Sequence, residues 1–311
     1  MILFSIVNLL DEQKCYDYLV DILHPDGLHC PGCQKATEQS DIHRRDRAPL
    51  FYFRCSCGRV YNAFSGTVWQ GTHHRCSEVV RILQGIAQGT PTLHLAKELE
   101  MDRKHLLERR HKIQAFAAQA CARKPLPDEA VETDELYQNA GEKGKLHPNP
   151  EDPPRCRGNK VRGHGTWEND RLPVVGTVGR ESGQVQIEVK KNSGRQDLEP
   201  HVVTATQEGV TVNTDEWGAY HHLPEAHRIH KTVCHSKHEW ARDDDGDGIR
   251  EVHINTIEGL WTGLRNFLRP FRGVNKEYLQ QYIAIHEWAH NLKKVTIEFL
   301  RVLCGITRLA S

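Results

Sequence analysis

Residues 130–138 read AVETDELYQ, and three segments of the same character follow: LPVVGTVGR at 172–180, QVQIEVKKN at 184–192 and GVTVNTDEW at 209–217. All four are rich in Val, Ile and Thr and are bounded by Gly, Asn or Ser, which is the pattern of β-strands. Residues 196–207, between the third and fourth segments, are predicted to form a helix. Three meandering strands, a helical crossover and a further strand predict a mixed β-sheet.

A long insertion separates the first two predicted strands. Residues 139–170 are full of Gly, Pro, Lys and Arg, a composition that predicts either a disordered loop or a functional one. Beyond residue 254 the sequence is predicted to be helical to its end. Residues 265–311 hold eight Lys or Arg against three acidic residues, which predicts a basic face suited to phosphates.

Two cysteine pairs mark the N-terminal part of the chain. Cys30 and Cys33 form a C-x-x-C pair, Cys55 and Cys57 form a C-x-C pair, and 21 residues lie between the pairs. This spacing is typical of a zinc ribbon, in which four thiolates hold Zn²⁺ tetrahedrally and leave no position for a substrate. The predicted zinc site is therefore structural. Two coincidental pairs in a reduced core are the alternative, and the histidines that could substitute as ligands are His29 and His43.

Apolar residues recur at helical intervals between residues 76 and 124. A helix at 93–100, a break at Met101 and Asp102 and a basic helix from Arg103 are typical of a helix-turn-helix, whose second helix lies in the major groove of DNA. The side chains predicted to contact DNA from this second helix are Arg103, Lys104, Arg109 and Arg110. The alternative is a spacer bundle whose basic side chains are merely solvated.

Length and composition place the chain among globular proteins with more than one domain. Its 311 residues are about twice the ~150 residues of one domain, and Pro125 and Pro127 mark the main boundary. We expect an N-terminal helix and zinc ribbon at 1–75, a helical DNA-binding domain at 76–124 and a sheet domain at 125–311. The apolar share of 38% and the charged share of 26% exclude collagen-like and disordered classes.

The distribution of charged and apolar residues indicates which partners and which cellular compartment to expect for this protein. The 41 basic and 41 acidic residues cancel overall, but residues 1–125 carry 17 basic and 13 acidic residues, a net charge of +4. No run reaches the ~18 apolar residues of a membrane-spanning helix. Ten cysteines in a chain without an export signal indicate metal binding rather than disulfides. We expect a cytoplasmic protein with no membrane partner.

Three carboxylates stand in segments that are otherwise predicted to be buried: Asp134 in the first strand, Asp215 at the end of the fourth and Glu258 in the first turn of a helix. Buried carboxylates are costly unless they are paired or hold cations, and oxygen ligands indicate Mg²⁺ or Mn²⁺. Two such ions about 3.5 to 4 Å apart support phosphodiester chemistry. The spacing leaves alternatives open, because Glu132 shares a strand face with Asp134 and Glu216 follows Asp215.

Two further motifs point to other metals. Residues 243–251 begin like a calcium loop, but its twelfth position is Ile254 rather than a bidentate glutamate, so a solvated turn is the preferred interpretation. Residues 286–290 read HEWAH, the H-E-x-x-H arrangement that holds zinc in some peptidases. The third ligand of the extended motif is missing, since Thr296 stands where histidine is required. These histidines are therefore predicted to lie on the surface or to face DNA.

Five blocks of the chain read CYDYLVDILHPDGLHCPGC, FRCSCGRVYNAFSGTVWQGT, VETDELYQ, VNTDEWGAY and CHSKHEW…VHINTIEGLW. In this order, and across nearly the whole chain, they resemble the zinc-ribbon DDE transposases of bacterial insertion sequences. The family motif V-x-x-D-E-x-Y selects Asp134, T-D-x-x-x-x-Y selects Asp215, and H-x-N-T-x-E-x-x-W selects Glu258. The chain departs from the family in its C-x-C second knuckle and in the acidic stretch Asp243 to Gly248.

The resemblance implies a ribonuclease-H-like domain of mixed α/β fold. In such a domain Asp134, Asp215 and Glu258 meet on two Mg²⁺ or Mn²⁺ ions, with His235 nearby, while a structural Zn²⁺ stays in the ribbon. The implied function is that of a transposase, which binds the terminal inverted repeats of its element, cleaves the DNA ends and transfers them to target DNA.

DNA is therefore the expected partner of the chain. Because two ends are cut and joined in concert, we expect a homodimer or a higher oligomer on DNA. Outside the helical domain, the residues expected to hold the DNA backbone are Lys143, Lys145, Lys160, Arg162, Arg265, Arg269 and Arg272.

A competing hypothesis is a non-catalytic DNA-binding regulator, built from the ribbon and the helices, with a degenerate nuclease-like domain. The complete set of Asp134, Asp215 and Glu258 argues against it. A zinc peptidase that uses residues 286–290 is a minor alternative.

Overall fold

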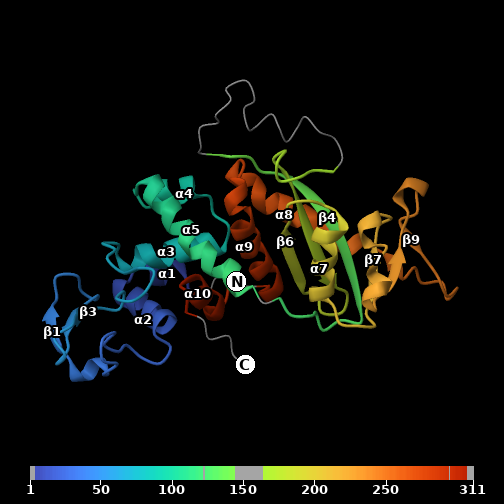
Figure 1. The fold of residues 1–311 in the computed structure, drawn as a ribbon. Helices are drawn as coiled ribbons and strands as arrows, with labels where there is room; N and C mark the ends of the chain where they lie inside the picture. Colours follow the sequence, from blue (N-terminus) through green and yellow to red (C-terminus); the bar gives the residue numbers. More distant parts are fainter. Residues whose placement is uncertain (1–3, 122, 144–163, 294, 307–311) are drawn as a thin grey trace. The chain divides into compact units, whose positions relative to one another are not determined.

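The computed structural model describes residues 4–121, 123–143, 164–293 and 295–306 (Figure 1). They fall into two compact units, one formed by the described parts of 1–120 and 292–311 and the other by those of 121–291. Every helix in the described ranges is too short or too polar to cross a membrane.

The second unit is built on a five-stranded mixed sheet of order β6-β5-β4-β7-β8, in which β4 is antiparallel to β5 and parallel to β7. The four predicted strands and the predicted helix are confirmed, and with them the mixed α/β fold. The sequence pattern does not predict β8, since IHKT is too short and too polar to carry a strand signal. The elements are β4 (Ala130–Asn139), β5 (Arg171–Gly179), β6 (Val185–Val189), α7 (Arg195–Ala205), β7 (Thr211–Thr214) and β8 (Ile229–Thr232).

Helices cover both faces of this sheet (Figure 1): α8 (Asn255–Leu268) and α9 (Leu279–Leu292) bury one face, and α7 packs on the other. Because successive residues of a strand point to opposite faces, Leu136 of β4 joins the core under α8, whereas Val131 joins the core under α7. The even-numbered residues of β4 therefore face α8, and these include Glu132 and Asp134.

Short elements complete the second unit. A hairpin of β9 (Ala241–Arg242) and β10 (Val252–His253) carries the acidic stretch in its loop. The remaining turns of 3-10 helix are η2 (Gly218–Tyr220), η3 (Leu223–Ala226), η4 (His235–Lys237), η5 (Arg269–Phe271) and η6 (Lys276–Tyr278).

The first unit contains the ribbon and a helical bundle. The ribbon strands form an antiparallel sheet, and a small core there contains Cys30, Cys55 and Tyr61. The break predicted at Met101 and Asp102 separates α4 from α5, and the Asp102 carboxylate accepts a hydrogen bond from His105 N at 2.9 Å. The elements are α1 (Ile6–Leu9), α2 (Glu12–Leu23), η1 (Thr37–Gln39), β1 (Asp41–Arg44), β2 (Tyr52–Arg54), β3 (Val60–Tyr61), α3 (Cys76–Ala87), α4 (Thr92–Glu98), α5 (Arg103–Ala120) and α10 (Ile297–Leu303).

The last helix, α10, packs against α2, α3 and α5, whereas the sequence places it in the domain at 125–311. α9 ends at Leu292, and Lys293 adopts a φ of 55°, which ends the helical backbone. Leu300 and Leu303 of α10 are buried in the first unit. The pattern of apolar residues predicts a helix here but does not show which of two cores the helix joins, because the hydrophobic effect favours burial without selecting the partner surface.

Candidate active site

Glu132 is a fully buried carboxylate that fastens α8 to the sheet. It accepts hydrogen bonds from the backbone N–H groups of Thr256 at 2.8 Å and Ile257 at 3.1 Å, and from the Thr256 hydroxyl at 2.9 Å. It also lies 3.1 Å from Arg180 Nε and 3.2 Å from His253 Nδ1. A carboxylate at a helix N-terminus satisfies N–H groups that have no partner within the helix. Every oxygen of Glu132 is thus engaged in holding α8.

Asp134 lies two residues further along the same strand face and contacts the same helix. Its Oδ2 accepts a hydrogen bond from Trp261 Nε1 at 2.9 Å. Gly176 of β5 stands opposite Asp134, and a Cβ added there would lie only 2.5 Å from the Trp261 ring. The absence of a side chain at Gly176 leaves the space that the indole needs to reach Asp134.

Asp215 follows the last residue of β7, beside β4. The register pairs Glu132 with Asn213, so Asp215 comes level with the middle of β4. Its Oδ1 accepts a hydrogen bond from Trp217 N at 2.9 Å, which fixes the carboxylate at the strand end. Glu258 lies in the first turn of α8, is exposed, and precedes Trp261 by three residues, or about one turn.

The charges of Asp215 and Glu258 act on the pKa of Asp134. Burial raises the pKa of Asp134 to about 6; the Trp261 hydrogen bond opposes that shift, and the charges of Asp215 and Glu258 add to it. Burial also raises the pKa of Asp215, against the hydrogen bond from Trp217 N. Asp134 therefore lies within electrostatic reach of both other carboxylates, an arrangement that favours cation binding.

The three carboxylates are nevertheless not clustered as tightly as the ligands of a single ion. Among the described residues, metal-ligating atoms of three or more His, Cys, Asp or Glu side chains lie within 4.8 Å of one another at the four cysteines and at Asp243, Asp245 and Asp247. Two ions about 3.5 to 4 Å apart have ligands on their outer sides, and carboxylates repel one another without a cation between them. Among the described residues, these three carboxylates therefore do not form a preformed single-ion site.

A fourth carboxylate, Glu135, lies beside this group and was not selected by the sequence analysis. Its Oε2 accepts a hydrogen bond from the Tyr220 hydroxyl at 2.7 Å, and its Oε1 lies 3.3 Å from the Tyr137 hydroxyl. Burial raises its pKa to about 8, with further contributions from the charges of Asp134 and Asp215. The sequence signals for Glu135 are its position next to Asp134, on the opposite face of the strand, and its place as the E of the motif V-x-x-D-E-x-Y.

The cysteine cluster has the geometry of a zinc site. Cys30 Sγ lies 3.6 Å from Cys57 Sγ, and Cys33 Sγ lies 3.4 Å from Cys55 Sγ. Tetrahedral Zn–S bonds of about 2.3 Å place sulfurs about 3.8 Å apart, so the four thiols could hold zinc. All four cysteines belong to the cluster, including the two of the C-x-C knuckle.

The substitute ligands lie outside that cluster. His29 Nδ1 is hydrogen-bonded to the Gly27 carbonyl at 2.8 Å, and His43 lies against Arg54. Neither histidine is among the clustered ligand atoms.

The H-E-x-x-H segment on α9 is structural. Glu287 is buried, accepts a hydrogen bond from Ile187 N at 2.9 Å and pairs with Arg123 at 3.1 Å. His286 is half-buried, and His290 is hydrogen-bonded to the Gly183 carbonyl at 3.0 Å. The prediction that these histidines lie on the surface or face DNA is wrong for His286, whose ring packs against Phe267 of α8 with ring centres 5.3 Å apart.

The acidic hairpin loop resembles a calcium loop only in part. Ligand oxygens of Asp243, Asp245 and Asp247 lie within 4.8 Å of one another, and Asp243 accepts hydrogen bonds from the N–H groups of Gly246 and Gly248. The element before the loop is strand β9 rather than a helix. A solvated turn accounts for this geometry without an ion.

The basic residues predicted to contact DNA from α5 divide into two groups. Arg103 and Lys104 are exposed at the start of the helix. Arg110 is 0% exposed and donates to the Thr90 carbonyl, so the prediction that it contacts DNA is corrected: it is a core residue. Arg109 is half-buried, donates to the Val68 carbonyl, and its guanidinium lies 5.3 Å from the Trp69 ring centre.

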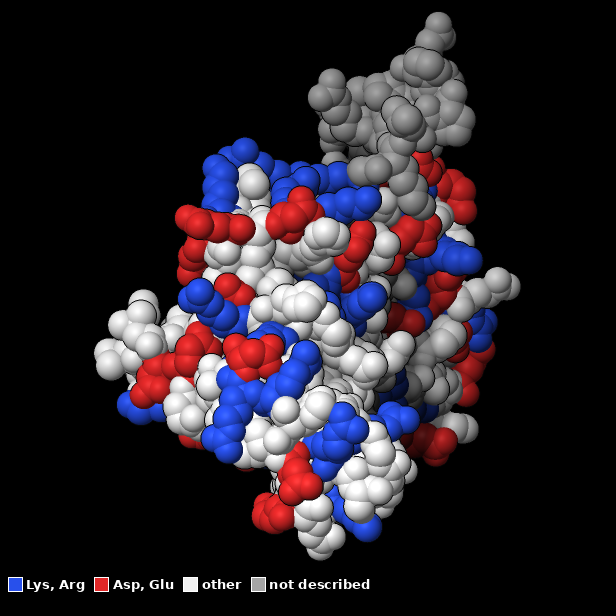
Figure 2. Space-filling view, turned by 90° about the vertical axis from the view of Figure 1, so that its left-hand side faces the viewer, with Lys and Arg blue, Asp and Glu red and all other residues white. Residues whose placement is uncertain are grey.

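The basic residues of the second unit also differ in their surroundings. Arg265, Arg269 and Arg272 are exposed at and after the end of α8. Lys143 Nζ donates to the carbonyls of Phe271, Arg272 and Gly273 at 2.8 to 3.0 Å, and this contact ties the start of the insertion to the end of α8. Three of the predicted contacts lie outside the described residues: Lys145, Lys160 and Arg162. Figure 2 shows Lys and Arg interspersed with Asp and Glu on one face, not one continuous basic surface.

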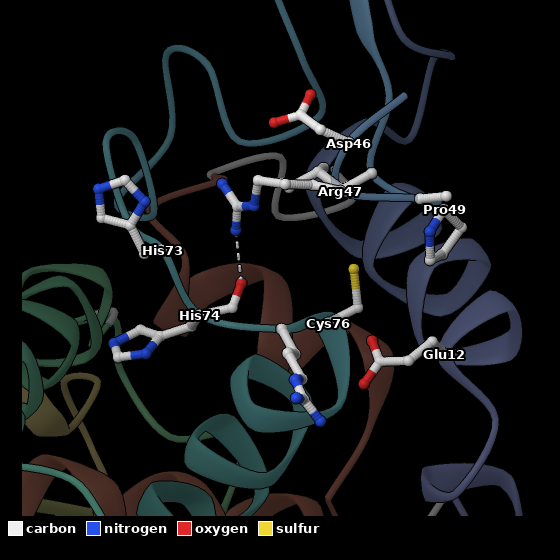
Figure 3. Close-up of a pocket in the computed structure, with 10 residues that line it drawn as sticks. Glu12, Asp46, Arg47, Pro49, His73, His74 and Cys76 are labelled. Carbon is white, nitrogen blue, oxygen red and sulfur yellow. Dashed lines mark hydrogen bonds between the residues drawn. The ribbon is translucent and has the colours of Figure 1, made fainter. Parts of the chain in front are cut away.

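A polar pocket of about 310 Å³ lies in the first unit, lined by residues that include Glu12, Asp46 and Cys76 (Figure 3). Arg47 reaches across it and donates to the carbonyls of Thr72 at 3.1 Å and His74 at 2.8 Å. These bonds join the turn after β1 to the segment that leads into α3, which is a structural role.

The fold and the site define the class of this protein: a zinc-ribbon protein with a ribonuclease-H-like sheet that carries an acidic triad on β4, after β7 and on α8. Residues 126–291 match the ISXO2-like transposase domain, and the chain belongs to this family of transposases. The resemblance predicted from the sequence is thereby confirmed.

The chain is also similar to a relative by sequence and to chains of two solved assemblies. The chain is 28% identical, over 90% of its length and 91% of the relative's, to an uncharacterized protein in transposable element ISH50 of Halobacterium salinarum. It is also similar to a chain of a simian T-cell lymphotropic virus intasome solved in complex with the PP2A regulatory subunit B56 gamma, at 14% identity, 70% coverage of both chains and a TM-score of 0.31. A pre-cleavage Mos1 transpososome matches at 11% identity and a TM-score of 0.21, over 69% of this chain and 78% of that one.

Proposed function

We propose that this transposase binds the terminal inverted repeats of its element, cleaves the DNA ends and transfers them to target DNA, using Asp134, Asp215 and Glu258. The observation that carries the proposal is the placement of the three carboxylates: Asp215 follows the strand β7 that pairs with β4, and Glu258 lies one turn before Trp261, which donates to Asp134 at 2.9 Å. Mg²⁺ or Mn²⁺ ions bound there would activate the attacking oxygen and neutralise the leaving one. Asp134 and Asp215 would bind the ions from two neighbouring strands, and Glu258 would complete the second position.

The chain's own contacts support the positioning that this chemistry needs. Trp261 holds the orientation of Asp134, and the backbone N–H of Trp217 holds that of Asp215. A carboxylate that is fixed before the ion binds loses less side-chain freedom on binding. The exposed basic residues would hold DNA phosphates, a contribution that weakens as salt rises. They are Arg103 and Lys104 on α5, and Arg265, Arg269 and Arg272 at and after the end of α8.

Replacing Asp215 with asparagine tests the proposal. The protein is incubated with Mg²⁺ and DNA that bears the ends of its element, and cleavage is followed on a gel. We expect cleavage by Asp215→Asn to fall on the order of 10³-fold or more, because asparagine lacks the charge that binds the ion. Asp245→Asn in the exposed hairpin loop is the matched control, with cleavage equal to that of the unmodified protein.

Cleavage by Asp215→Asn at the normal rate would contradict the site assignment. DNA binding without cleavage by the unmodified protein would instead favour the regulator, in which the sheet domain is degenerate. The complete acidic triad and its coupling argue against the regulator.

We also propose that Zn²⁺ at Cys30, Cys33, Cys55 and Cys57 holds the ribbon together. The core of the ribbon is small, so metal binding must supply much of its folding free energy. Cys33→Ser is expected to lose zinc and to expose the backbone of β1–β3 to hydrogen exchange, while the β4–β5 amides stay protected. Cys234→Ser, which lies outside the cluster, is the control. A zinc-free chain with fully protected ribbon strands would contradict this role.

A further inference from the structure

Aromatic rings surround the strand end that carries Asp215. Trp217, whose backbone binds that carboxylate, is fixed by a hydrogen bond from its Nε1 to the Ser193 carbonyl at 2.9 Å. The His164 ring stacks on the Trp217 indole, with ring centres 4.0 Å apart and planes at 25°. Tyr137 meets His164 edge-on, with ring centres 5.3 Å apart. His164 is an exposed residue.

A second aromatic pair comes from the segment that follows β8. The rings of His235 and Trp240 lie 4.7 Å apart at 41°, and Trp240 is 55% exposed. Glu216, the neighbour of Asp215, accepts hydrogen bonds from the N–H groups of His235 at 2.9 Å and Ser236 at 3.1 Å. The segment that bears this pair is therefore tied directly to the end of β7.

Both pairs lie close to the Asp215 carboxylate. Trp217 of the first pair donates its backbone N–H to Asp215 at 2.9 Å, and Glu216, next to Asp215, accepts from the backbone N–H of His235 of the second pair at 2.9 Å. If a phosphodiester is held at Asp134 and Asp215, the base of the adjoining nucleotide must lie within a few bonds of that position. Among the described residues, His164 and Trp240 are exposed aromatic residues of these two pairs.

Stacking restricts what these rings can bind. Inside a duplex both faces of each base are covered by neighbouring bases, so a protein ring can stack only on a base that is unpaired or terminal. Base–aromatic stacking contributes about 1–3 kcal/mol per base and tolerates any sequence. A cleaved DNA end supplies a terminal nucleotide of this kind at the carboxylates.

We propose that Trp240, together with the stacked His164 and Trp217, forms a surface that binds the unpaired terminal nucleotide of a DNA end by stacking on its base. This inference rests on the proposed function, since it places DNA at the acidic triad. It assigns to these residues the positioning of the end, and no part in the bond-making chemistry.

The test measures DNA binding by the full chain without added divalent ion, so that no cleavage occurs. The probe is a duplex of arbitrary sequence with a short single-stranded overhang that carries 2-aminopurine, and a blunt duplex of the same sequence is the reference. The unmodified protein is expected to quench the 2-aminopurine fluorescence. Trp240→Leu should lose the quenching and bind the overhang DNA roughly 5- to 100-fold more weakly, with unchanged binding to the blunt duplex.

Two controls separate stacking from packing. Trp240→Phe keeps an aromatic face and should retain most of the quenching, and Ile249→Ala, an exposed apolar residue on the same hairpin, should behave like the unmodified protein. The proposal would be overturned if Trp240→Leu weakened the binding of overhang DNA and blunt DNA equally. It would also be overturned if Trp240→Leu quenched the 2-aminopurine fluorescence as strongly as Ile249→Ala. A change in mass by light scattering would show instead that Trp240 joins two copies of the chain.

The test distinguishes failure of the stacking surface from failure of the proposed function. Normal cleavage that depends on Asp215, combined with unaltered binding by Trp240→Leu, would overturn the stacking surface alone. Failure of the unmodified protein to bind either DNA would overturn both.

Discussion

Replacing Asp134 with asparagine is expected to abolish DNA cleavage and, at the same time, to stabilise the sheet of the protein at pH 7. Burial and two neighbouring carboxylates raise the pKa of Asp134 from an ordinary value of 3.8 to about 6. Ionised Asp134 therefore destabilises the fold when no ion is bound. Asparagine keeps the acceptor for Trp261 and removes the charge, so the gain should be roughly 1–3 kcal/mol.

Because the pKa of Asp134 is raised in the folded protein, the stability gained by Asp134→Asn depends on pH. Because the pKa is higher in the folded state, the stabilising contribution of protonated Asp134 is fully present below about pH 4 and is lost as pH rises through about 6. The difference in stability between Asp134→Asn and the unmodified protein should accordingly be large at pH 7 and vanish near pH 4. Hydrogen exchange of the β4–β5 amides in urea, without added Mg²⁺, measures this difference in the free energy of unfolding for the sheet alone.

Cleavage should show the opposite trend with pH. A divalent ion binds the deprotonated carboxylate, so at limiting Mg²⁺ the activity of the unmodified protein should fall as pH drops through about 6. Excess Mg²⁺ should move that midpoint to lower pH. An Asp134→Asn protein that cleaves DNA would contradict the role of Asp134 in cleavage. An Asp134→Asn protein that is less stable at pH 7 would contradict the destabilising effect of the buried charge.

Replacing Glu132 with alanine is expected to destabilise the sheet and to lower its free energy of unfolding by about 3–5 kcal/mol. The substitution leaves the guanidinium of Arg180 and the N–H groups of Thr256 and Ile257 without the buried carboxylate that they contact. Breaking a buried ion pair by removing one partner is strongly destabilising, because the remaining charge stays buried. The same exchange measurement on β4–β5 gives the loss.

Glu132→Gln is the matched variant, since it keeps an acceptor for the helix N-terminus and loses only the charge. It should be less destabilised than the alanine variant and should retain measurable cleavage per folded molecule, in contrast to Asp134→Asn. A Glu132→Ala protein that is stable but inactive would contradict this assignment, because it would give Glu132 the role in cleavage that we assign to Asp134.

Local sequence patterns were sufficient for much of this protein. The alternation and composition of residues 130–217 predicted four strands and the crossover helix α7, because strand and helix periods depend on neighbouring residues alone. The spacing of Cys30, Cys33, Cys55 and Cys57 predicted their cluster, because the two knuckles are short and each brings its own thiols together. The family motifs predicted the membership that residues 126–291 now show.

The tertiary structure decided how side chains of the same type are used. Glu132 and Asp134 share one face of one strand, and only the position of α8, more than 120 residues further along the chain, makes the first a helix anchor and leaves the second to the acidic triad. Arg110 is a core residue although its helix is strongly charged, and Glu287 is paired with Arg123 although its motif is that of a zinc peptidase. Burial and charge pairing depend on contacts between distant segments, so the sequence determined the elements and the ligand types, and the packing of those elements determined which polar groups stay available for chemistry.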